Sequence, residues 1–216
     1  GQVTQKGGER WNAARAYLDP HRHQTNLNVV SQAHATQILF EGKRAVGVQY
    51  AINGVTHQVR AKREVIVSGG AFGSPQLLML SGVGPALHLK DLGIPLVHEL
   101  PGVGQNLQDH VTTVLIYKTA IVDHAMGYSL KGTWNMLKAI WEWRTQRKGW
   151  VTSNVSETQG FVSTQGNHDY PNIQLALCTG VIDDHARKMH WGHGYTLHVT
   201  LMRPKSRGSV TLASSN

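Results

Sequence analysis

Residues 65–85 constrain the fold more than any other part of this chain. An apolar run at 65–67 leads into small residues at 68–73, and Ser74 and Pro75 follow. The pattern predicts a buried strand over 64–68, a turn, and a helix over 74–80 that Ser74 caps and Pro75 begins. Gly82, just beyond the helix, is typical of a helix end.

The turn between this strand and helix has almost no side-chain bulk. Ser68, Gly69, Gly70 and Ala71 leave the backbone open to close approach by a flat or charged group. The sequence therefore predicts a ligand contact at this turn. Close packing of the strand against the helix is the alternative use of small residues here.

A second glycine-rich segment at 102–110 ends in Asn106, Asp109 and His110. Together with residues 70–84 it resembles the glucose–methanol–choline (GMC) family of flavin-dependent oxidoreductases. The resemblance implies FAD as cofactor and oxidation of the CH–OH group of a primary alcohol or choline. It leaves the electron acceptor open among oxygen, a quinone and a cytochrome. The alternative function is a non-catalytic, truncated binding module of the same fold.

The resemblance also implies which residues contact the cofactor. They are Ala35, which would meet the adenine through its backbone, the turn residues Ser68, Gly69, Gly70 and Ala71, and, near the domain junction, Asn106 and His110. Alternatively, Ala35 is an ordinary strand residue, and Asn106 and Asp109 shape a turn by bonding their own backbone.

Glu157 is expected in the substrate pocket, because it resembles a family position before a cavity-lining strand. A carboxylate there would attract a cationic substrate such as choline. If the cavity is apolar, Glu157 would instead cap or pair structurally.

Two parts of the family pattern are absent from this sequence. It contains no G-x-G-x-x-G turn, on which the flavin pyrophosphate would be held. The catalytic histidine of the family is expected beyond Asn216. We therefore expect a central fragment of a longer enzyme that has no catalytic residue of its own, does not hold FAD tightly and is inactive alone.

The expected fold class is α/β (α+β), with a partial FAD-binding Rossmann-like domain over 1–109 and an antiparallel-sheet substrate domain over 110–216. Alternation of apolar and polar residues predicts strands, and a helical period predicts a long amphipathic helix that covers one face of the second sheet. Asn53-Gly54 predicts a hairpin, and residues 209–212 are expected to pair with the second sheet. The predicted strands are 27–30, 35–40, 45–50, 55–60, 64–68, 111–118, 158–162, 172–178 and 195–202, and the helices after the first are 85–92 and 129–147.

Composition excludes several classes of function. The net charge of +8 comes from scattered basic residues, so we expect no nucleic-acid partner. No apolar run is long enough for a transmembrane segment. The single cysteine, Cys178, fits a reducing compartment, so we expect a cytoplasmic protein, with peripheral membrane association as an alternative. The histidine pairs at 21/23 and 190/193 lack further ligands at a recognised spacing, and no metal site is expected.

Overall fold

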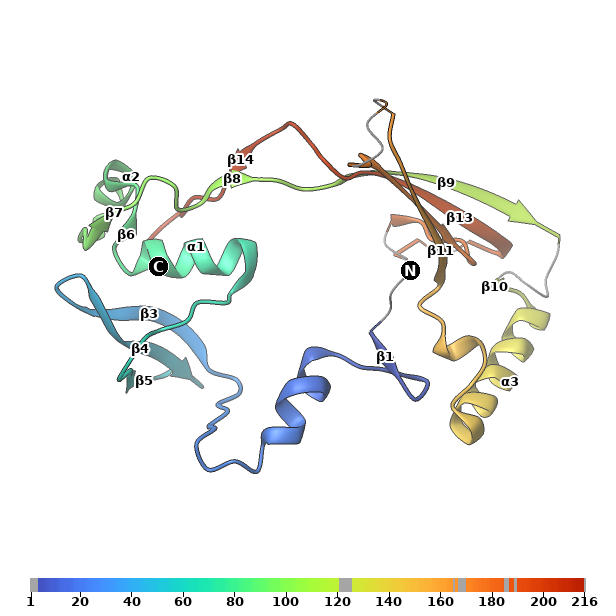
Figure 1. Ribbon diagram of the computed structural model, residues 1–216, viewed down its shortest axis with the longest axis horizontal. Helices are drawn as coiled ribbons and strands as arrows, with labels where there is room; N and C mark the ends of the chain where they lie inside the picture. Colours follow the sequence, from blue (N-terminus) through green and yellow to red (C-terminus); the bar gives the residue numbers. More distant parts are fainter. Residues whose placement is uncertain are drawn as a thin grey trace. The chain divides into compact units, whose positions relative to one another are not determined.

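The computed structural model describes residues 4–120, 126–164, 166, 170–184, 187–188 and 190–215 (Figure 1). The chain forms two compact units. Unit 1 contains Gly1–Leu27 and His110–Pro204, and unit 2 contains Asn28–Asp109 and Lys205–Asn216. The chain changes unit at 27/28, 109/110 and 204/205. The expected division into domains over 1–109 and 110–216 stays a prediction. The flavin and substrate roles of the two domains stay a prediction.

Unit 2 is built on a three-stranded antiparallel sheet in the order β3-β4-β5. The strands span His34–Glu41, Arg44–Ile52 and Val55–Arg60, which confirms three of the predicted strands. Asn53 and Gly54 join β4 to β5 with φ of 49° and 79°. Positive φ at both central residues is the geometry that an Asn-Gly hairpin turn favours, because it matches the twist of the strands.

Helix α1 (Gly70–Leu80) packs beside β3, and α2 (Ala86–Asp91) follows it (Figure 1). Met79 and Leu89 are fully buried and form the core of unit 2 with Val103. Gly82, with φ of 84°, follows the last turn of α1 as predicted. Short strands β6 (Val83–Gly84) and β7 (His98–Glu99) pair in parallel.

Two predicted strands are wrong, because residues 27–30 and 64–68 are irregular. Ile66, expected to be buried, is 78% exposed. An extended segment becomes a strand only when a neighbour satisfies its backbone N–H and C=O groups. No strand in the described part of the chain pairs with either segment.

Unit 1 contains a five-stranded antiparallel sheet. Strand β13 pairs with β9, with β12 and, at its first residues, with β10, while β11 pairs with β12. The strands are β9 (Val111–Thr119), β10 (Gly127–Tyr128), β11 (Ser156–Val162), β12 (Ile173–Cys178) and β13 (Gly192–Leu201). Four of them correspond to predicted strands.

The long helix α3 spans Leu130–Gln146, as the sequence predicts. Ser129 caps it by accepting a hydrogen bond from the Gly132 N–H at 3.0 Å. That it covers one face of the sheet stays a prediction. The helix contacts β10, which is a strand of the sheet, and the short helix η3 (Trp150–Thr152). A hairpin of β1 (Gln5–Lys6) and β2 (Glu9–Arg10), followed by η1 (Ala14–Leu18) and η2 (Asp19–His21), completes unit 1.

The last predicted strand has a different partner from the one expected. Strand β14 (Gly208–Ser209) pairs with β8 (Gln105–Leu107) in unit 2, and not with the larger sheet. The Val210 N–H donates to the Gly104 carbonyl at 2.7 Å and continues this pairing. The mixed α/β class with antiparallel sheets is confirmed, and in the described residues no helix has the length and apolarity to cross a membrane.

Candidate functional site

Helix α1 begins four residues earlier than the sequence predicts, at Gly70. Ser74 therefore lies inside the helix and is not its N-cap; its Oγ accepts a hydrogen bond from the Gly69 N–H at 2.9 Å. Gly70 has φ of 80°, a conformation that side chains other than glycine rarely adopt. Gly70 and Ala71 thus lie in the exposed first turn of α1, and Ser68 and Gly69 directly precede it.

Pro75 also lies inside α1, one position after Ser74. It has no N–H, so the carbonyl of Ala71 lacks its usual i+4 partner. Gly73 faces open space, since a Cβ added there would meet nothing within 4 Å. This half of α1 therefore offers main-chain groups that bulky side chains do not cover.

A groove runs along this side of α1 within unit 2, and we call it the α1 groove. Its volume is about 440 Å³. One wall comes from α1 and the other from β8 and its flanking residues, with Val210 contributed from the end of the chain. The lining residues are Ala71, Ser74, Pro75, Leu78, Val103, Gly104, Gln105, Asn106, Leu107, Gln108 and Val210.

Two residues expected to bind the cofactor, Ala71 and Asn106, meet in the α1 groove although they are distant in sequence. Asn106 is exposed and has φ of 63°, a left-handed conformation that asparagine tolerates better than most residues. The Gln108 amide donates to the Asn106 carbonyl at 3.4 Å. Three amide side chains of this short segment, those of Gln105, Asn106 and Gln108, line the groove.

In the second wall of this groove, sequence reasoning named Asn106 but missed Gln105, Gln108 and Val210. Gly104 has φ of 77°, and a Cβ there would come within 2.1 Å of the Val210 carbonyl. This close approach lets the end of the chain pair with β8 and hold Asn106 in place. Gly104 indicated that another segment could approach closely here, but its partner Val210 is more than a hundred residues away in the sequence and could not be identified from it.

The α1 groove contains no charged side chain among the residues that line it. Its polar groups are the Ser74 hydroxyl and the amides of Gln105, Asn106 and Gln108, with an apolar floor that includes Leu78 and Val103. Such groups can donate and accept hydrogen bonds but cannot act as a general base near neutral pH. The lining residues therefore offer hydrogen bonds and apolar contacts to a ligand.

The remaining predicted residues lie elsewhere. Ala35 is exposed on β3, which is an edge strand of its sheet. Ser68, Gly69 and Gly70 directly precede Ala71 and are exposed. His110 is the first residue of unit 1 after the crossing, so the α1 groove does not include it.

Glu157 lies in β11, at a bulge between Ser156 and Thr158. Its side chain is outside the described residues. The expected role of Glu157 in a substrate pocket stays a prediction.

The histidines with ligand-like spacing have separate partners. His190 Nε2 lies 2.8 Å from the Asp183 carboxylate, and this hydrogen bond lowers the pKa of the Asp183 carboxyl from its ordinary value. His193 Nε2 lies 2.7 Å from the Ser129 hydroxyl. In the described ranges no three His, Cys, Asp or Glu side chains gather as they would around a metal ion.

Comparison with solved structures shows the same fold in flavoproteins. An FAD-dependent oxidoreductase from Chaetomium thermophilum matches 97% of this chain and 42% of its own, with a TM-score of 0.82 and 25% identity. A formate oxidase matches 99% of this chain and 41% of its own, with a TM-score of 0.84 and 25% identity.

Curated relatives are similar along the whole sequence. An alcohol dehydrogenase [acceptor] of Pseudomonas putida is 45% identical over 100% of this chain and 39% of its own length. The oxygen-dependent choline dehydrogenase of Chromohalobacter salexigens is 41% identical over 99% of this chain and 38% of its own length. The mitochondrial choline dehydrogenase of Homo sapiens is 43% identical over 99% of this chain and 36% of its own length. The chain thus spans about two fifths of the length of these relatives.

The profile of the GMC oxidoreductase family matches residues 1–112, which include β3, α1 and most of the α1 groove. Because this match extends over half of the sequence and the fold agrees, the chain belongs to the GMC oxidoreductase family.

Proposed function

We propose that this chain is part of an FAD-dependent oxidoreductase that oxidises the CH–OH group of a primary alcohol or choline. Family membership and the names of the most similar relatives support this function. The observation that carries it is the α1 groove, in which Ala71 and Asn106 meet. Both were expected at the cofactor from the sequence.

The residues of unit 2 fit a flavin dinucleotide. A Cβ at Gly70 or Gly73 would meet nothing within 4 Å, which leaves the open space that a flat, extended ligand needs. The groove amides can bond the hydroxyl and carbonyl groups of such a ligand. In this proposal Ala71 and Asn106 contact FAD in the groove, with Ser68–Gly70 beside them, and Ala35 offers its backbone at the edge of β3. Bound FAD would supply the hydride acceptor.

Unit 1 is proposed as part of the substrate domain, with its five-stranded sheet as a wall of the substrate cavity and Glu157 facing the substrate. His110 would lie near the cofactor. The groups that bind the pyrophosphate and the base that takes the hydroxyl proton are proposed to lie in other parts of the enzyme. A cytoplasmic location, with the protein free or at a membrane surface, completes the proposal.

The test uses protein purified from the complete coding sequence that contains this chain. We expect a bound flavin with yellow absorbance, and anaerobic bleaching of that absorbance when a primary alcohol or choline is added. Bound flavin that no alcohol bleaches would refute the proposed reaction. Protein without any flavin would instead favour the non-catalytic binding module.

A single substitution tests whether FAD binds in the α1 groove, independently of the proposed reaction. Ala71→Leu adds bulk at an exposed helical position in the α1 groove, so we expect roughly tenfold weaker FAD retention, which corresponds to the loss of one or two good contacts. Gln76→Leu is the matched control, because Gln76 is exposed on the same helix outside the groove. Equal retention in both variants would show that FAD does not use the groove.

A further inference from the structure

Helix α3 turns an apolar stripe outward. Leu130, Trp134, Leu137 and Trp141 follow one another at spacings of four, three and four residues, which places them on one side of a helix. Their exposed fractions are 88%, 69%, 56% and 64%. Single exposed apolar residues are common, but a continuous row of them marks an interaction surface. We call this row the α3 stripe.

The opposite side of α3 is fixed against unit 1. A Cβ on Gly132 would come within 2.3 Å of the Gly127 carbonyl, so β10 lies directly against the first turn. Ala139 is buried in the middle of the helix. Near the end, Trp143 Nε1 donates to the Gly8 carbonyl at 2.8 Å. Turning the helix to bury the stripe would break these contacts, so the stripe stays outward.

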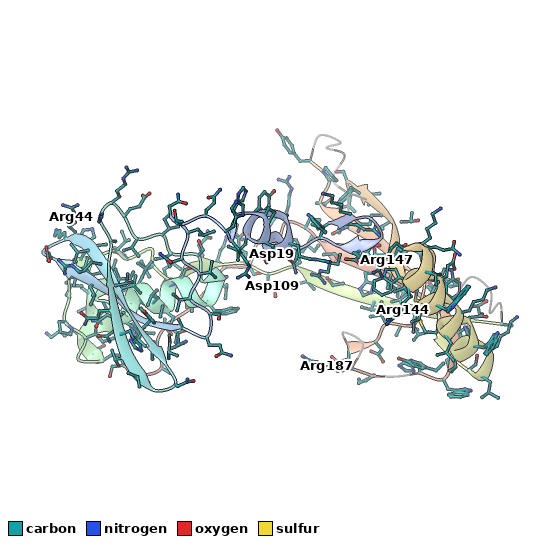
Figure 2. All side chains as sticks on the ribbon, turned by 90° about the horizontal axis from the view of Figure 1, so that it is seen from below. Asp19, Arg44, Asp109, Arg144, Arg147 and Arg187 are labelled. Atoms are coloured by element: carbon teal, nitrogen blue, oxygen red, sulfur yellow. The ribbon has the colours of Figure 1, made fainter. Side chains whose placement is uncertain are left out.

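Basic residues lie on α3 and directly after it. Lys138, Arg144 and Lys148 are all exposed, and we call them the basic rim. Glu142 is the only acidic residue of the helix and is half-buried next to Gly149. Figure 2 shows Arg144 and Arg147 at the last turn of α3. The guanidinium of Arg147 is paired with Glu9 at 3.3 Å, so Arg147 is not counted in the basic rim.

Charge and composition decide between the possible occupants of the stripe. A second copy of the helix would bring the same lysine and arginine side chains close to one another, which is unfavourable. Tryptophan, leucine and flanking basic residues are instead the combination found on helices that lie in a membrane interface, with tryptophan at the level of the headgroups. We propose that the α3 stripe binds the surface of an anionic lipid bilayer, with α3 parallel to the membrane.

Vesicle binding by the purified, complete protein tests this proposal. We expect it to sediment with vesicles of phosphatidylcholine and phosphatidylglycerol, much less with phosphatidylcholine alone, and less at high salt because the basic rim is screened. The double variant Trp134→Ala/Trp141→Ala should lower the partition coefficient by roughly tenfold or more, since two large apolar side chains are removed. Lys138→Glu/Arg144→Glu should abolish the preference for the anionic lipid.

Two control variants match these changes. Tyr17→Ala removes an aromatic side chain that is 77% exposed outside the stripe. Arg44→Glu reverses an exposed charge in unit 2. Both control variants should bind the vesicles like the unaltered protein. Because all the changed side chains are exposed, far-ultraviolet circular dichroism should show that every variant is folded.

Three outcomes would overturn the proposal. The first is no binding to anionic vesicles, and the second is binding that the stripe and rim variants leave unchanged. The third is a lipid-free dimer, measured by light scattering, that the two tryptophan substitutions convert to a monomer. That result would assign the stripe to a second copy of the chain.

Discussion

Ser81 joins α1 to the edge of β3, and its removal should destabilise unit 2 measurably. The Ser81 hydroxyl donates to the Leu77 carbonyl at 2.6 Å and accepts from the Ile38 N–H at 2.8 Å. Ser81 is 3% exposed and Ile38 is 4% exposed, so water does not replace the lost bond easily. Ser81→Ala therefore leaves a buried N–H without a partner.

The expected cost is about 1–3 kcal/mol, the usual penalty for an unsatisfied buried polar group. This corresponds to an increase of roughly 5- to 150-fold in the equilibrium constant for opening. The methyl group of alanine is smaller than the serine side chain by one oxygen atom. The substitution thus causes no steric strain, and the lost hydrogen bonds account for the effect.

Amide hydrogen exchange is the suitable assay, because every tryptophan of the chain lies in unit 1 and fluorescence does not report on unit 2. Exchange at Ile38 and along β3 should accelerate by the factor given above. Ser31→Ala is the control, since Ser31 is exposed in a loop. A change below twofold at Ile38 in Ser81→Ala would refute the argument that Ser81 holds α1 to the sheet.

Three further predictions concern other contacts. Gly104→Ala should unpair β14 from β8, because its Cβ would clash with the Val210 carbonyl, and faster amide exchange at Val210 measures this; unchanged exchange would contradict it. The pKa of Glu9 is lowered from 4.5, chiefly because Arg15 donates a hydrogen bond to its carboxylate. The ionised Glu9 therefore stabilises the folded protein above pH 4.5, and this stabilisation is lost as the pH falls through the lowered pKa. Carboxyl titration by NMR should show the pKa of Glu9 rising towards 4.5 in Arg15→Met, and an unchanged value would exclude this cause. Burial raises the pKa of the Cys178 thiol, so a thiol reagent at pH 8 should react slowly until denaturant is added; rapid reaction of the folded protein would contradict its burial.

Much of the local structure could be predicted from the sequence because neighbouring residues decide it. The Asn53-Gly54 turn requires positive φ at two positions, and few other residue pairs permit it. The limits of α3 follow from the Ser129 cap and from Arg147, which ends the helix in a left-handed conformation. Of the residues that line the α1 groove, the sequence analysis named Ala71 and Asn106 as cofactor contacts but not Gln105, Gln108 or Val210, and their role at a cofactor stays a prediction.

The errors have a common cause, which is dependence on distant partners. Residues 64–68 have the composition of a strand, but no described strand pairs with them. Ser209 was expected in the larger sheet, yet it pairs with Gln105 in unit 2. An alternating pattern predicts that a segment can form a β-strand, but it does not predict which other segment that strand pairs with.

The sequence by itself determined the family, the backbone turns and most of the regular elements, since these depend on small residues and caps at fixed local spacing. Only the tertiary structure decided that α1 and β8 enclose one groove and that α3 presents its apolar stripe outward. Periodicity defines an apolar face of a helix, but the contacts of Gly132, Ala139 and Trp143 decide which face is turned to the protein. Such contacts join segments far apart in the chain, and their energies depend on packing that no local pattern contains.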